Sequence, residues 1–173
     1  MRRLKAGVAL FLLLSLQVSI FAHLRPFDVA PDVLLVAAIV GGLVGGGDFG
    51  ARHGFVAGLL LDLVVPGPFG LAAGVYGTVG YATGLFSRSF DSQDPRVVPV
   101  LTGLASFVAM IVYGFGLGVL GSEQFVEWHL VWVAFAVSVY SVILVFPVQT
   151  LYGWVMADDG TAARTDSARS VVN

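Results

Sequence analysis

The sequence predicts an all-α membrane protein, a six-transmembrane-helix bundle with both termini in the cytoplasm. Hydrophobic residues make up 57% of the chain and charged residues only 12%, whereas soluble domains carry about 25% charged residues. The mean hydropathy is +0.90, so most side chains must face lipid or one another. The basic residues also gather on one side of the expected spans, as they do in the cytoplasmic loops of membrane proteins.

The length of 173 residues suits a single transmembrane domain over residues 1–156. Six spans of about 20 residues need roughly 120 residues, which leaves no room for a separate soluble domain. The polar tail at 157–173 is expected to be a disordered cytoplasmic segment. The expected spans are residues 4–21, 32–47, 51–65, 69–86, 97–120 and 128–155.

The first span follows a basic start and resembles a signal peptide. Arg2, Arg3 and Lys5 precede an apolar run that continues to Ala22. The run is long for a signal peptide, its small-residue cleavage pattern is poor, and further spans follow. The segment is therefore expected to remain as the first helix.

The second span has a clear start in the sequence, whereas the third span is short for a membrane crossing. Pro31 and Asp32 open the second, where an acid at a helix start suits capping and the helix dipole. The third span has 15 residues, or about 22 Å of helix, against a bilayer core of about 30 Å. It either crosses a locally thinned bilayer or is re-entrant, which would leave five spans.

The sixth span is long and carries a proline. Pro147 removes one backbone hydrogen bond and is expected to kink the helix. Trp132 and Tyr152 are 20 residues apart, about 30 Å along a helix, which matches the two aromatic belts of a bilayer.

The basic residues indicate the orientation of the six spans. With the N-terminus in the cytoplasm, only Arg25 of the nine Lys and Arg residues lies outside. The bias favours an even number of spans with both ends inside. The basic residues placed inside are Arg2, Arg3, Lys5, Arg52, Arg88, Arg96, Arg164 and Arg169.

Gly54, Gly58 and Asp62 are spaced by four and share one face of the third span. Small residues allow a neighbouring helix to approach closely, so Asp62 is expected to point at that neighbour. Its carboxylate then serves as an interhelical bond or a cap near the Pro66 turn, as a binding or signalling group, or as part of a proton or ion relay.

The fourth and fifth spans also carry small residues on one stripe each, which indicates helix packing or the docking of a partner helix. The stripe of the fourth span lies within about 80° around a helix. It comprises Gly70, Gly74, Gly77, Tyr81 and Gly84. The stripe of the fifth span comprises Gly103, Ser106, Met110, Gly114 and Gly121.

The composition argues against several kinds of chemistry. The chain has no cysteine, which excludes thiolate chemistry. Its three histidines lack metal-site spacing, so we expect no metal and no cofactor. Ser and Asp form no activated nucleophile with a nearby base, so the chain is not expected to be an enzyme. A net charge of −2 gives no reason to expect nucleic-acid binding.

Taken together, these motifs resemble the MreD family of rod shape-determining membrane proteins. The resemblance lies in the basic start, in Pro31-Asp32 before the second span, in Gly54 and Gly58 with Asp62, in Pro66 and Pro68, and in Gly70 with the Gly77–Gly84 segment. It covers nearly the whole chain in length and in the order of spans. It implies a fold similar to the substrate-binding subunits of energy-coupling-factor vitamin transporters.

The resemblance also implies a function and partners. The protein would be a non-enzymatic scaffold of the bacterial cell-elongation machinery, in the cytoplasmic membrane. It would bind MreC and, through it, connect to MreB, RodA and a class B penicillin-binding transpeptidase. A small-solute binding subunit of a transporter is the alternative. That function requires an outward-opening polar pocket, whereas the polar residues within the spans are scattered.

Overall fold

The computed structural model describes residues 2–21, 29–87, 96–120 and 128–156. All regular structure in these ranges is helical. The expected tail at 157–173 lies outside the described residues, as do most of the connections before α2, between α4 and α5, and between α5 and α6. The helices are α1 (Arg2–Leu16), α2 (Val33–Gly45), α3 (Gly47–Val64), α4 (Leu71–Phe86), α5 (Val97–Val119) and α6 (Trp128–Met156).

Two of these helices are long and apolar enough to cross a membrane by themselves. They are α5 and the Leu130–Val155 part of α6, which continues through Pro147. The segments Leu4–Ile20 and Val33–Gly45 are apolar but shorter. A five-residue π-helical segment, η1 (Gln17–Phe21), extends α1.

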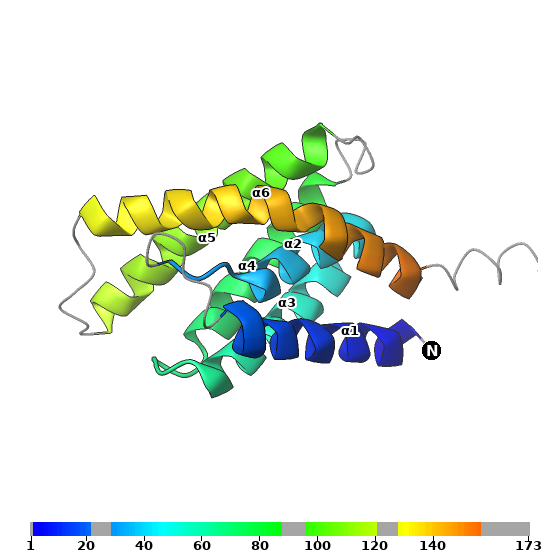
Figure 1. Cartoon of the computed structure of the whole chain (residues 1–173), viewed down its shortest axis with the longest axis horizontal. Helices are drawn as coiled ribbons and strands as arrows, with labels where there is room; N and C mark the ends of the chain where they lie inside the picture. The colour runs from blue at the N-terminus through cyan, green and yellow to red at the C-terminus, as the bar shows by residue number, and fades with distance from the viewer. Residues whose placement is uncertain (1, 22–28, 88–95, 121–127, 157–173) are drawn as a thin grey trace, which may run out of the picture.

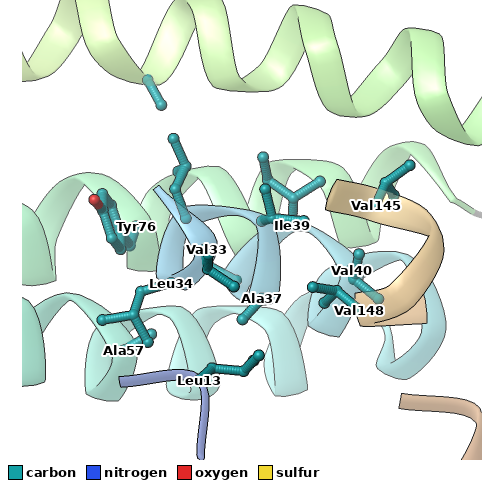
Figure 2. Packing of buried hydrophobic residues seen from close by; sticks show 14 of the residues in the cluster. Leu13, Val33, Leu34, Ala37, Ile39, Val40, Ala57, Tyr76, Val145 and Val148 are labelled. Carbon is teal, nitrogen blue, oxygen red and sulfur yellow. The ribbon is translucent and has the colours of Figure 1, made fainter. Parts of the chain in front are cut away.

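Helix α2 forms the centre of the bundle. Every residue from Val33 to Leu43 is buried, which explains why this helix is apolar all round. In Figure 1, α2 lies in the middle, with α6 along one side and α1 along the other. Figure 2 shows its side chains meeting Leu13, Ala57 and Val148 from three other helices.

A single glycine separates α2 from α3. Gly46 has a φ of 80°, a left-handed conformation that glycine adopts without steric cost. Helix α2 therefore ends at Gly45, and α3 begins at Gly47 rather than at residue 51 as expected. With 18 residues, α3 is about 27 Å long, which is longer than the sequence indicated.

Helices α3 and α4 pack with their backbones in close contact. A Cβ atom added at Gly54 would overlap the carbonyl group of Tyr76, and one added at Gly58 would overlap that of Ala72. One turn before Gly54, Gly50 meets the carbonyl of Gly80. Each step of four residues along α3 is thus matched by a step of four back along α4, as in antiparallel helices joined through small residues.

Three glycines bring α2, α3 and α4 together at one point. A Cβ atom on Gly42 of α2 would overlap the carbonyl oxygen of Gly80. A Cβ atom on Gly50 would overlap both that oxygen and the Cα atom of Gly42. Backbone atoms of all three helices occupy this space, so a shift of the nearby Thr83 side chain would not make room for a methyl group.

We expect Gly80→Ala to destabilise the protein and Gly74→Ala to leave it unchanged or slightly more stable. The methyl group at position 80 meets backbone of α3, and overpacking of this kind costs about 1–3 kcal/mol. At position 74, on the same helix, nothing lies within 4 Å, and alanine favours a helix by about 1 kcal/mol. Thermal unfolding of both variants in detergent measures the difference, and equal midpoints would contradict this packing.

Candidate functional site: polar contacts at the two ends of the helical core

The carboxylate of Asp62 caps the first turn of α4. It accepts hydrogen bonds from the backbone N–H groups of Gly70 at 2.9 Å, Ala73 at 3.1 Å and Ala72 at 3.2 Å. These groups have no partners within their own helix, and a carboxylate there also suits the helix dipole. The observed contact is the capping alternative considered for Asp62, and it ties the end of α3 to the start of α4.

Asp32 acts at the start of α2 in two ways. One carboxylate oxygen accepts from the N–H of Leu35 at 3.0 Å, so the expected N-cap is present. The other accepts a hydrogen bond from the hydroxyl of Tyr76 on α4. Nearby, the side chain of Gln17 donates to the carbonyl of Pro31 and accepts from the N–H of Val33. These contacts join η1, α2 and α4.

Both carboxylates belong to the same end of the bundle. Tyr76 and Tyr113 of α5 lie close enough to Asp32 and Asp62 for electrostatic interaction. The cluster therefore brings residues from α2, α3, α4 and α5 together. Composition and spacing singled out the two acids, but neither tyrosine carried a signal in the sequence.

The turn between α3 and α4 carries two further residues singled out by the sequence, Pro66 and Gly70, and both are exposed. Pro31, which precedes α2, is buried. Gly70 has a φ of 93°, which places a positive-φ residue directly before α4. The turn lets the chain reverse so that the N–H groups of α4 meet Asp62.

The stripe expected on α4 does not form one contact face. Gly84 packs on backbone of Gly46 and Gly47, and the ring of Tyr81 lies over Gly47. A Cβ atom added at Gly77 would lie 3.3 Å from the carbonyl oxygen of Ala51 on α3, whereas no atom lies within 4 Å of one added at Gly74. The closely packed face is instead formed by Ala72, Tyr76, Gly80 and Gly84. The reason is that the Asp62 cap fixes how α4 is rotated against α3, which glycine spacing alone does not reveal.

A second polar contact, at the other end of the core, was not anticipated. His53 of α3 is buried, and its Nε2 atom forms a hydrogen bond with the hydroxyl of Tyr152 on α6. The ring of Phe49 stacks on His53 with centroids 5.1 Å apart. Tyr152 is fully buried, so its ring faces the inside of the bundle and not the surface that lipid would cover. Its phenol lies inward because His53 provides the partner that a buried hydroxyl requires.

Helices α5 and α6 are joined through small residues and hydroxyl groups. Ser138 donates to the carbonyl of Gly103 at 2.7 Å, and Gly114 faces Leu130. The hydroxyls of Thr102, Ser106 and Ser141 are buried without a hydrogen-bond partner in the part of the chain that the structure describes. Within the described residues, no group of three acidic or histidine side chains could hold a metal ion.

The described chain is an all-helical bundle in which two helices are long and apolar enough to cross a membrane, and its polar contacts serve packing and capping. A family model described as rod shape-determining protein MreD matches residues 1–155. The chain therefore belongs to the MreD family, a family of membrane proteins with a role in rod shape determination and not a known enzyme family. No curated protein and no solved structure matches the chain.

We expect Asp62→Ala to lower the free energy of unfolding by about 1–2 kcal/mol, the usual cost of losing an N-cap side chain. Asp62→Asn keeps one oxygen acceptor and should lie between the alanine variant and the wild type. Thermal unfolding in detergent gives the order. If the alanine variant unfolds like the wild type, the three hydrogen bonds do not stabilise α4.

Proposed function

We propose that the protein is a non-enzymatic scaffold of the bacterial cell-elongation machinery, a multi-pass protein of the cytoplasmic membrane. It binds MreC and helps couple it to peptidoglycan synthesis and to the control of cell shape. MreB, RodA and a class B penicillin-binding transpeptidase are indirect partners. The observation that carries this proposal is the family match over residues 1–155.

The packing of the glycine face of α3 limits the surfaces that a partner can bind. The Gly50, Gly54 and Gly58 face of α3 is filled by α4 of the same chain, so it is not free to receive another helix. Large apolar side chains remain exposed on α1, α5 and α6, among them Phe11, Phe115 and Ile143. In the proposed scaffold, these outer surfaces meet lipid and the partner's membrane segment.

The arrangement of the ends supports an even number of spans. The start of α1 and the end of α6 lie at the same end of the bundle in Figure 1. The α2–α3 junction belongs to this end as well, because Gly45 and Phe49 share a cavity with Ala6 near the start of α1. The proposed topology places this end in the cytoplasm, together with Arg52 and Lys5.

No specific observation favours the solute-binding alternative. That function needs polar groups converging on a pocket that opens outward. At the end of the core that the proposed topology places outside, the carboxylates of Asp32 and Asp62 are already bonded to backbone N–H groups and to Tyr76. Their hydrogen-bonding capacity thus serves the fold.

Purification of the tagged protein from bacterial membranes should recover MreC, identified by mass spectrometry. The control detects association that occurs only in detergent. Membranes from one strain with this protein tagged and from another strain with differently tagged MreC are mixed after lysis, and the purification is repeated. Recovery of an ATP-binding module without cell-wall proteins would instead favour transport.

Single cysteines should report the two sides of the membrane without background, because the natural chain contains none. A membrane-impermeant maleimide should label Gly67→Cys, in the α3–α4 turn, in intact spheroplasts. Ser167→Cys, in the tail, should react only after the membrane is opened, since six spans return the chain to the cytoplasm. Labelling of both positions in intact spheroplasts would rule out the proposed topology.

A further inference from the structure

A cavity of about 680 Å³ lies between α1 and α3 at the end of the bundle that contains the α2–α3 junction. This volume is in the range of small-molecule sites, about 300–1,000 Å³. Its walls come from the first half of α1, from Gly45 at the end of α2 and from the first half of α3. The polar contacts at the opposite end of the core play no part in it.

The polar part of the lining holds one charge of each sign. Asp48 and Arg52 both line the cavity, one helical turn apart on α3. Both are exposed, and within the described part of the chain neither side chain has an ion-pair partner. Residues at this spacing have Cβ atoms about 5–6 Å apart. The cavity therefore presents a cation and an anion side by side.

The remaining walls are apolar or already bonded. His53 is held by Tyr152 and Phe49, so it forms a fixed wall. Leu10 and Val56 line the cavity on the side toward the middle of the two helices. A Cβ atom added at Gly7 would meet nothing within 4 Å, which shows that the α1 wall leaves open space.

The cavity is open because α1 is attached mainly to other helices. Ala6 and Ala9 pack on Val155 of α6, and the ammonium group of Lys5 lies 4.8 Å from the ring centre of Trp154. At its other end, α1 is bonded to the start of α2 through Gln17. Contacts between α1 and α3 are few, so the gap between these two helices is accessible from the side, where lipid lies in a membrane protein.

We propose that this cavity binds the headgroup of an aminophospholipid, phosphatidylethanolamine, from the leaflet facing the α2–α3 junction. The lipid phosphate pairs with the guanidinium of Arg52, and the primary ammonium, two carbons away, pairs with the carboxylate of Asp48. The glycerol and upper acyl chains follow Leu10 and Val56 toward the bilayer. A headgroup that carries only negative charge would leave the carboxylate of Asp48 facing another negative group. Complementary charges at both positions require a negative group beside Arg52 and a positive group beside Asp48.

The assignment to the cytoplasmic leaflet rests on the proposed topology, whereas the choice of headgroup rests on the cavity alone. The test uses the full-length protein in nanodiscs of phosphatidylcholine containing equal amounts of phosphatidylethanolamine and phosphatidylglycerol. Lipids retained after release into detergent are counted by native mass spectrometry. We expect the wild type to retain phosphatidylethanolamine over phosphatidylglycerol by about fivefold, the ratio that one contact of about 1 kcal/mol gives.

Four variants locate the binding. Arg52→Ala should lose retained phospholipid, and Asp48→Ala should lose the preference for the ethanolamine lipid. Gly7→Leu places a side chain in the open space and should block binding while the fold is kept, as judged by thermal unfolding. Arg96→Ala removes a cation outside the cavity lining and should behave as the wild type.

Three results would overturn the proposal: preferential retention of phosphatidylglycerol, equal retention of both lipids, or retention by Gly7→Leu equal to that of Arg96→Ala. The outcome is independent of MreC binding, because the lipid is counted in the isolated protein. Recovery of MreC with the Gly7→Leu variant would show that the scaffold function stands apart from the lipid site. Loss of MreC recovery from the wild type would contradict the scaffold and leave the lipid count unchanged.

Discussion

Close contact of the α2, α3 and α4 backbones at Gly42, Gly50 and Gly80 is the constraint on which the rest of the structure depends. Apolar side chains give helices little reason to associate inside a bilayer, because lipid is equally apolar. Close backbone approach replaces that driving force with dispersion contacts, and glycine permits the shortest approach. The three helices form a compact unit around which α1, α5 and α6 are placed.

Polar contacts fix the geometry of that unit at both ends. Asp62 sets the start and rotation of α4, and Asp32 joins α2 to the hydroxyl of Tyr76. At the other end, His53 connects α3 to Tyr152 of α6, 99 residues away in the sequence. A polar group left without a hydrogen bond in an apolar environment costs free energy. Each of these contacts therefore favours one arrangement of the helices over arrangements that are slightly shifted or rotated.

The division between core and surface has a consequence for function. The glycine faces that stand out in the sequence are largely covered by other helices of the same chain, as Gly54 and Gly58 are covered by α4. The large apolar side chains that remain exposed belong mainly to the outer helices α1, α5 and α6. A scaffold built this way presents a stable core and leaves its outer surfaces to partners and lipid, whereas the α1–α3 cavity is a separate feature with its own charge pattern.

The sequence by itself determined the helical character of the chain, its family resemblance, most helix bounds to within a few residues, and the capping roles open to Asp32 and Asp62. These follow from local rules, namely hydropathy over a window, proline and acid at a helix start, and glycine at repeated spacing. The start of α3 was missed because the positive φ of Gly46 shortens the α2–α3 connection to one residue. The tertiary structure alone decided which face of α4 meets α3, the pairing of His53 with Tyr152, and the placing of Asp48 and Arg52 beside α1. These features depend on how helices distant in sequence are rotated against one another. A helix that is apolar on every side has no hydrophobic stripe in its sequence that would reveal this rotation.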